Sequence, residues 1–143
     1  MQKLKLMIVD DEYLIRQYIR NCIDWERLGY TIVGELGTAQ GALQLAEELK
    51  PDVVLTDICM PGLDGLSFTG LLKGSCPNVR VIAVTGHDDF EYAQRGIRVG
   101  LDNYLLKPID EKELENVALE IKESILSQQS QDELFRELTD YRR

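Results

Sequence analysis

The sequence predicts an α/β fold: one five-stranded parallel sheet, covered by helices on both faces, in a single domain. Three observations lead to this fold class. The length of 143 residues is about that of one average domain. Five short apolar runs, rich in branched residues, have the length and composition of strands buried on both faces of a parallel sheet. A segment with helical periodicity follows each run, which gives a doubly wound (βα)5 order.

The five predicted strands span residues 4–9, 31–36, 53–56, 79–84 and 103–106. The predicted helices are marked by apolar residues, which in the first and second helices recur three or four positions apart, the pattern of an amphipathic helix. From the first helix to the fifth, these residues are Leu14, Ile15, Tyr18, Ile19 and Cys22; Ala42, Leu45, Ala46 and Leu49; Leu66, Leu71 and Leu72; Phe90, Ala93 and Ile97; and Leu114, Val117, Ala118, Ile121 and Ile125. We expect Trp25 and Tyr30 to pack in the core after the first helix. Thr38, Asp64 and Asp110 are the predicted caps of the second, third and fifth helices.

The end of the chain has a different composition. Residues 127–131 form a short polar interruption, and residues 130–133 (SQDE) have the pattern of a capping box. Apolar residues then follow at helical spacing, namely Leu134, Phe135, Leu138 and Tyr141. We therefore expect residues 3–126 to form the domain and residues 127–143 to be a linker or a C-terminal helix.

The charge and cysteine content exclude several classes of function. With 16 Lys and Arg against 25 Asp and Glu, the net charge of -9 predicts that this segment does not bind nucleic acid directly. Cys22, Cys59 and Cys76 are too few and too scattered for a disulfide framework or a zinc site, and His87 is the only histidine. No stretch approaches the roughly 20 apolar residues that a membrane span needs. The sequence predicts a soluble, cytoplasmic protein with reduced thiols.

Reactive side chains follow four of the five predicted strands. Asp10 and Asp11 come after the first strand, Asp57 after the third, Thr85 after the fourth and Lys107 after the fifth. Each has an ordinary explanation alone: Asp11 as an acid at a helix N-terminus, for example, or Lys107 as a surface charge. The carboxyl ends of parallel strands meet at one edge of the sheet, where ligands bind. The combination therefore predicts a functional site at that edge.

Clustered carboxylates repel one another, and a hard divalent cation such as Mg2+ relieves this repulsion. With its charge screened, Asp57 could attack a phosphoryl group and form an aspartyl phosphate. Lys107 would neutralise the phosphoryl oxygens and Thr85 would donate a hydrogen bond to one of them. The sequence contains neither glycine-rich nucleotide-binding motif, so we expect the phosphoryl donor to be another molecule.

Four ordered motifs resemble those of the response-regulator receiver family of two-component signalling. They are residues 8–12 (IVDDE), 55–65 (LTDICMPGLDG), 84–86 (VTG) and 104–108 (YLLKP), and the resemblance covers about residues 3–126. It implies a flavodoxin-like fold, with Asp57 as the phosphoacceptor for a sensor histidine kinase. It further implies four expectations for the site. Mg2+ is bound by Asp10, Asp11, Asp57 and the backbone carbonyl of Cys59; Thr85 and Lys107 bind the phosphoryl group; the rotamer of Tyr104 reports activation; and the Lys107–Pro108 bond is cis.

A finer resemblance concerns two other segments. Residues 23–30 (IDWERLGY) and 88–93 (DDFEYA) are similar to receivers usually fused to AraC-type DNA-binding domains. This resemblance implies a transcription-regulating output domain beyond residue 143. Apart from this resemblance, we expect phosphorylation to switch the conformation of the face formed by the fourth helix, fifth strand and fifth helix, through which a homodimer could form.

Alternatives remain open at this point. The chain could be a stand-alone single-domain regulator, or a docking or dimerisation domain that works without phosphorylation. A phosphohydrolase with an aspartyl-phosphate intermediate would need an Asp-x-Asp pattern after the first strand, and residues 9–13 (VDDEY) lack that spacing. We therefore expect a signalling phosphoacceptor, which catalyses only its own phosphorylation and dephosphorylation, and no turnover enzyme.

Overall fold

The computed structural model describes residues 3–58, 65–86, 91, 94–96 and 100–141. In this part of the chain five parallel strands form one sheet in the order β2-β1-β3-β4-β5. Their bounds are β1 Leu4–Val9, β2 Tyr30–Leu36, β3 Val53–Asp57, β4 Arg80–Thr85 and β5 Asn103–Leu106. The predicted five-stranded parallel sheet is confirmed, and each predicted strand boundary is within one residue. The strand order changes direction between β1 and β3, where α/β sheets of this kind bind ligands.

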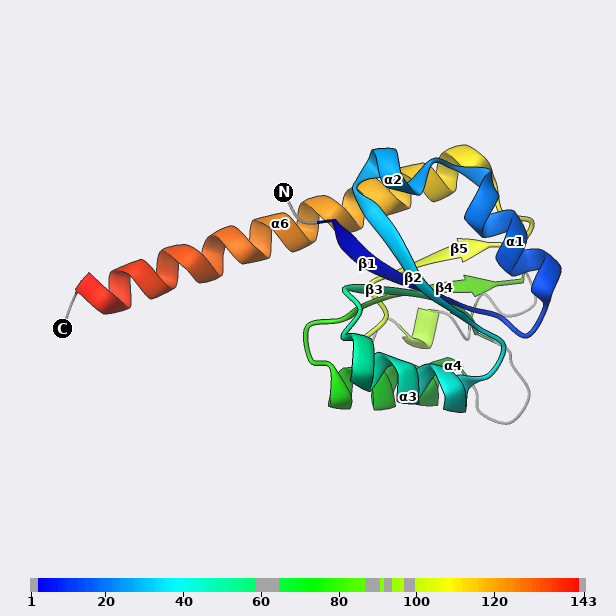
Figure 1. Ribbon diagram of the computed structural model, residues 1–143, viewed down its shortest axis with the longest axis horizontal. Helices are drawn as coiled ribbons and strands as arrows, with labels where there is room; N and C mark the ends of the chain where they lie inside the picture. Colours follow the sequence, from blue (N-terminus) through cyan, green and yellow to red (C-terminus); the bar gives the residue numbers. More distant parts are fainter. Residues whose placement is uncertain (1–2, 59–64, 87–90, 92–93, 97–99, 142–143) are drawn as a thin grey trace.

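Helices cover both faces of the sheet. Their bounds are α1 Tyr13–Cys22, α2 Trp25–Leu28, α3 Ala39–Leu49, α4 Gly65–Ser75 and α6 Glu111–Tyr141. Figure 1 shows α1, α2 and α6 on one face, and α3 and α4 on the other. The residues predicted for the fourth helix (Phe90, Ala93 and Ile97) and the predicted cap Asp64 lie outside the described residues.

At the start of three helices a side chain accepts a hydrogen bond from a backbone N–H group of the first turn. The side chains of Thr38 and Asp110 accept hydrogen bonds from the backbone N–H groups of Gly41 and Glu113, so both predicted caps are confirmed. The single turn α2 was not predicted. Asp24 caps its start with a side chain that accepts a hydrogen bond from the Arg27 N–H, and Gly29, whose φ of 93° suits glycine, caps its end.

Two hydrophobic cores lie on opposite sides of the sheet. Along β1, Leu6 and Ile8 belong to the core beneath α1 and α6, while Met7 and Val9 belong to the core above α3 and α4. This alternation follows from the two-residue period of a strand. Trp25 and Tyr30 are both buried and meet edge to face at 5.4 Å between ring centroids, which confirms their predicted role in the core.

Helix α1 uses only part of its apolar stripe for packing. Ile19 is fully buried, whereas Leu14 is 79% exposed and Tyr18 is 49% exposed. The Tyr18 hydroxyl donates to the backbone carbonyl of Ile109, so its ring lies along the connection between β5 and α6. Leu14 therefore remains an apolar residue on the surface.

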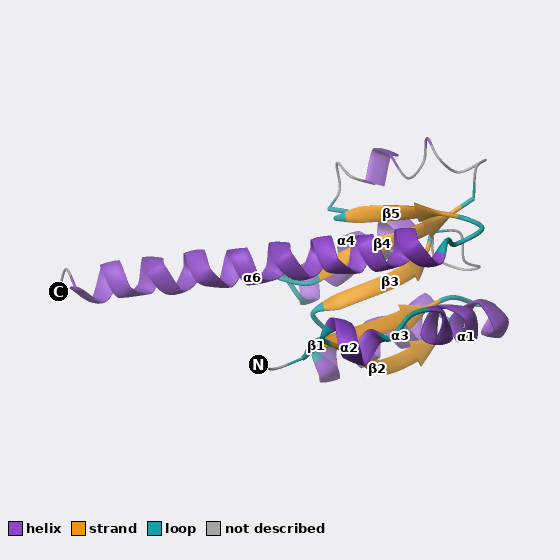
Figure 2. Cartoon of the chain, turned by 90° about the horizontal axis from the view of Figure 1, so that it is seen from above, coloured by secondary structure: helices purple, strands orange, loops and turns teal. Residues whose placement is uncertain are grey.

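The predicted interruption at residues 127–131 and the capping box at residues 130–133 are wrong, since α6 runs unbroken from Glu111 to Tyr141. Serine and glutamine are tolerated inside a helix, and the Gln128 side chain donates to Asp132 one turn later. From residue 127 to residue 139 every residue is exposed. Figures 1 and 2 show this part of α6 projecting away from the sheet. Among the described residues, no helix has both the length and the apolar character needed to cross a membrane.

Candidate functional site

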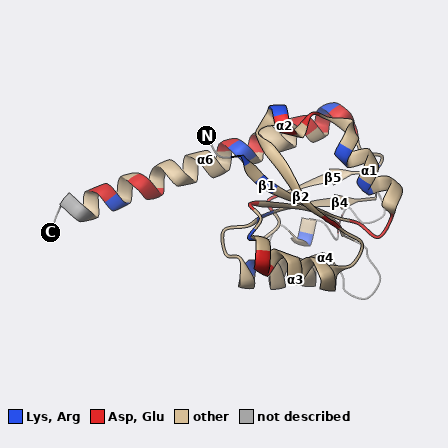
Figure 3. Ribbon diagram, viewed as in Figure 1, with Lys and Arg blue, Asp and Glu red and all other residues tan. Residues whose placement is uncertain are grey.

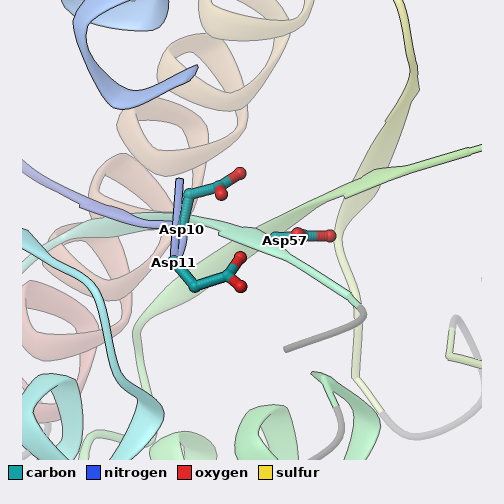
Figure 4. Close-up of side chains that lie close together, drawn as sticks. All are labelled: Asp10, Asp11 and Asp57. Carbon is teal, nitrogen blue, oxygen red and sulfur yellow. The ribbon is translucent and has the colours of Figure 1, made fainter. Parts of the chain in front are cut away.

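Three carboxylates meet where β1 and β3 end. Asp10 and Asp11 directly follow β1, and Asp57 is the last residue of β3. These strands are neighbours, with Val9 beside Thr56 in the register, so their ends deliver the three side chains to one place (Figure 4). One oxygen from each carboxylate lies within 4.8 Å of the other two. In Figure 3 the loop between β1 and α1 is red, which marks the acidic residues at this edge.

Asp10 is the most constrained of the three, with 1% of its surface exposed. Its Oδ1 accepts a hydrogen bond from the Glu12 N–H at 2.8 Å, while its buried Oδ2 has no hydrogen-bond partner among the described residues. Burial, and to a lesser degree the charge of Asp57, raise the pKa of Asp10 from 3.8 to about 6. A buried carboxylate oxygen without a donor, close to two other carboxylates, is the environment that a divalent cation fits.

Lys107 brings a positive charge to the same place. Its Nζ lies 3.4 Å from Oδ2 of Asp57, and its backbone N–H donates to the Thr85 carbonyl at 2.7 Å. The Lys107–Pro108 bond is cis, as the resemblance implied. Thr85 is fully buried at the end of β4, and its hydroxyl donates to the Gly86 carbonyl at 3.3 Å. The site therefore contains an acidic half from β1 and β3 and a lysine from the end of β5.

Of the other residues that the sequence analysis singled out, the structure describes Tyr104 but neither Cys59 nor His87. Tyr104 on β5 is half-buried and packs against the core beside α3 and α4. Cys59, predicted to offer a backbone carbonyl to the metal, and His87 lie outside the described residues.

Arg16 on α1 supports the acidic pair, and the sequence did not single it out. Its Nη1 donates to the backbone carbonyl of Asp10 at 2.5 Å, and its buried Nε lies 3.6 Å from the carboxylate of Glu35. Arg20 pairs with the same carboxylate, so Glu35 joins two arginines on one side of α1. A Cβ added at Gly37 would lie 3.3 Å from Arg16 Nη1, so glycine leaves room for the guanidinium. The backbone that carries Asp10 is thus fixed by a charged group.

Gly65 is a second supporting residue that the sequence did not single out. Its N–H donates to the Ile58 carbonyl at 2.8 Å, and a Cβ at this position would lie 2.6 Å from the Ile58 Cα. Ile58 directly follows Asp57, and its own N–H bonds the Val84 carbonyl at 3.0 Å. The start of α4 therefore packs closely against the backbone next to Asp57, which only glycine permits.

Comparisons with known proteins agree with this fold. The family model for the response regulator receiver domain matches residues 6–119. The chain belongs to this family, and it is a receiver domain of two-component response regulators.

Several of the relatives that the chain resembles are named as transcriptional regulators. The chain is 32% identical to the uncharacterized transcriptional regulatory protein YesN of Bacillus subtilis, over 94% of its own length and 38% of that protein. It is 35% identical to the transcriptional regulatory protein HptR of Staphylococcus aureus, over 90% of its length and 50% of HptR. The chain thus spans half or less of these curated relatives.

Two solved structures are similar over nearly their whole length. The receiver domain of AraT, a response regulator from Geobacillus stearothermophilus, has 40% identity and a TM-score of 0.84, covering 88% of this chain and 98% of that one. A two-component transcriptional regulator AraC from Clostridium phytofermentans has 31% identity and a TM-score of 0.83, covering 89% and 98%.

Proposed function

We propose that Asp57 accepts a phosphoryl group from a histidine kinase and that the phosphorylated domain controls an output domain that regulates transcription. The observation that carries this proposal is the position of the Asp57 carboxylate. It is 5% exposed, shares an edge of the sheet with Asp10 and Asp11, and lies 3.4 Å from the Lys107 ammonium. The similarity to transcriptional regulators supports the nature of the output.

The proposed transfer is a displacement at phosphorus. A carboxylate oxygen of Asp57 forms the new P–O bond while the P–N bond to the donor imidazole breaks. The electron pair of that bond stays on the imidazole nitrogen, which takes up a proton, and the product is an acyl phosphate. The Lys107 ammonium, which contacts the Asp57 carboxylate, is close enough to pair with the phosphoryl oxygens after transfer. The Thr85 hydroxyl is the proposed hydrogen-bond donor to one of these oxygens.

The residues present also fit Mg2+. Asp10, Asp11 and Asp57 would hold the ion, together with the Cys59 carbonyl, which lies outside the described residues. When bound, the ion supplies the positive charge that offsets the carboxylates and the incoming phosphoryl group. The buried, unpartnered Oδ2 of Asp10 supports this assignment.

The proposed response is a shift between two conformations of the domain. Thr85 moves toward the phosphoryl group, and Tyr104 turns into the space that Thr85 leaves. The surface formed by β5, α6 and the helix predicted around Phe90, Ala93 and Ile97 then changes and favours binding of an output domain or a second copy. The phosphoryl group shifts this equilibrium only by its different interaction with the two states, so an unphosphorylated domain retains a fraction of the active state.

The domain would act as a switch and would turn over only its own phosphoryl group. Autophosphorylation from a small donor and slow hydrolysis of the acyl phosphate are the two reactions we assign to it. The cytoplasm is the proposed compartment, in keeping with the free thiols of Cys22 and Cys76.

The proposal is tested by incubating the chain with Mg2+ and a small acyl-phosphate donor, and measuring the intact mass. The parent should gain the mass of one phosphoryl group, and Asp57→Ala should gain none. Beryllofluoride with Mg2+ should change the conformation of the parent only. If the parent and Asp57→Ala respond identically in mass and conformation, the phosphoacceptor function is wrong. A docking domain that works without phosphorylation would then be favoured.

A further inference from the structure

In the part of the domain that the structure describes, no residue buries the outer part of α6. The last core residue of the helix is Ile125, and all residues from 127 to 139 are exposed. Figures 1 and 2, seen from perpendicular directions, both show this segment extending past the sheet. An isolated helix of this length is marginal in water, because most helical stability in proteins comes from packing an apolar face. We therefore expect this segment to pack against a partner.

Large apolar side chains on this segment are directed to solvent. Leu134 is 57% exposed, Phe135 71% and Leu138 52%. Spacings of four, three and four residues connect Ser127, Gln131, Leu134 and Leu138, and we call these four residues the seam. The sequence has Tyr141 three positions further on. Alternation of four and three is the spacing of the a and d positions in a heptad, with Leu134 at d and Leu138 at a.

The charges on the segment follow the same heptad. Asp132, Glu133 and Arg136 fall at positions b, c and f, which face away from the seam (charged bands on the outer part of α6 in Figure 3). Glu137 is at a g position, and the sequence has Arg142 at the e position that a parallel two-stranded coil pairs with it. The seam thus has no charged residue, and in a parallel pair of copies one charged pair, Glu137 with Arg142, would flank it.

From these features we propose that residues 127–141 pair with the same segment of a second copy as a parallel, two-stranded coiled coil. A narrow stripe of a and d residues fits one partner helix, whereas docking on a globular domain uses a wider apolar face. Phe135, at the e position beside Leu134, widens the contact by one large side chain. This pairing is separate from the face of β5 and α6 in the proposed switch, and it does not need phosphorylation.

The oligomeric state tests the proposal. Sedimentation equilibrium of the parent, from micromolar to millimolar concentration, should show a dimer, and far-ultraviolet circular dichroism should show helicity rising with concentration. Leu134→Gln with Leu138→Gln should weaken the dimer at least about tenfold. The matched control, Gln129→Ala with Arg136→Ala at two outer f positions, should leave it unchanged. A parent that stays monomeric, or a dimer that tolerates the two leucine changes, would overturn the coiled coil.

A cysteine pair tests the parallel register. Under mild oxidation Gln131→Cys, on the seam, should give a covalent dimer, while Gln129→Cys and the parent should not. If Gln131→Cys does not crosslink although the chain is dimeric, the parallel arrangement is wrong. Asp57→Ala should dimerise as strongly as the parent. A dimer that depends on Asp57 and on an acyl-phosphate donor would instead belong to the switch face, so the two proposals can fail separately.

Discussion

Replacing Asp10 with asparagine should remove the pH dependence of stability that this buried carboxyl gives to the metal-free domain. Burial, aided by the Asp57 charge, raises the pKa of Asp10 from 3.8 to about 6. Between these values the folded domain binds more protons than the unfolded chain, so its stability falls as the pH rises. The difference of roughly two pH units at about 1.4 kcal/mol each amounts to about 3 kcal/mol. This stabilisation is present below pH 4 and lost above pH 6.

Asparagine has no carboxyl group to ionise, so the Asp10→Asn variant should lack this loss. In the presence of a chelator at pH 7.5 we expect it to be up to about 3 kcal/mol more stable than the parent, and the difference should shrink toward pH 4. Saturating Mg2+ should stabilise the parent, since a ligand that binds only the folded state adds stability, and should stabilise Asp10→Asn less. Binding of Mg2+ and the substitution thus both remove the free-energy cost of burying the negative charge of Asp10.

Urea unfolding at several pH values, followed by the fluorescence of the single tryptophan, measures these differences. Trp25 is 4% exposed in the folded protein, so unfolding changes its environment strongly. Glu12→Gln, at an exposed carboxylate next to the site, is the matched control and should follow the parent. Parallel pH profiles for the parent and Asp10→Asn, with chelator present, would refute the assigned role of Asp10.

Three further substitutions test other parts of the structure. Arg16→Ala should weaken Mg2+ binding about tenfold, with Arg16→Lys intermediate, because Arg16 holds the Asp10 carbonyl; an unchanged midpoint in a Mg2+ titration of stability would contradict this. Gly65→Ala should lower the free energy of unfolding in urea by about 1–3 kcal/mol, because the new Cβ would meet the Ile58 backbone. Gly70→Ala, where the new Cβ would lie in open space on the same helix, should raise the free energy of unfolding by about 0.5–1 kcal/mol. If the two glycine variants are equally stable, the close approach at α4 is wrong. Tyr30→Phe should lower the free energy of unfolding by about 1 kcal/mol, since its hydroxyl bonds a buried carbonyl of α6; no change in thermal unfolding would count against it.

The sheet was predictable because its signal is strong and local. Runs such as residues 81–84 are apolar at every position, which few structures other than a buried parallel strand accommodate. The helices were less predictable. Periodicity shows which residues share a face, but the depth of packing decides which are buried, and in α1 this includes Ile19 and excludes Leu14. In α6 the polar residues 127–131 resembled a break, yet the helix continues through them.

The candidate site was predictable as far as it depends on strand order. Once β1, β3 and β5 are neighbours or near neighbours in one sheet, the residues after them must converge, which is why Asp10, Asp57 and Lys107 were found. Arg16 and Gly65 were missed because their roles depend on three-dimensional contacts to backbone atoms. An arginine one turn into a helix and a glycine at a helix start are both common, and neither has a distinctive spacing.

The continuity of α6 also has a mechanical consequence. Its first half packs against the sheet through Leu114, Val117 and Ile121. Residues 127–139 are exposed in the part of the chain that the structure describes, so a small tilt of the first half beside β5 displaces the far end. At 1.5 Å per residue, the arm from Ile125 to Tyr141 is about 24 Å long, and a tilt of about 10° would carry its tip about 4 Å. A repacking too small to alter the core would thereby change where the outer part of the helix, with any partner packed on it, lies relative to the sheet.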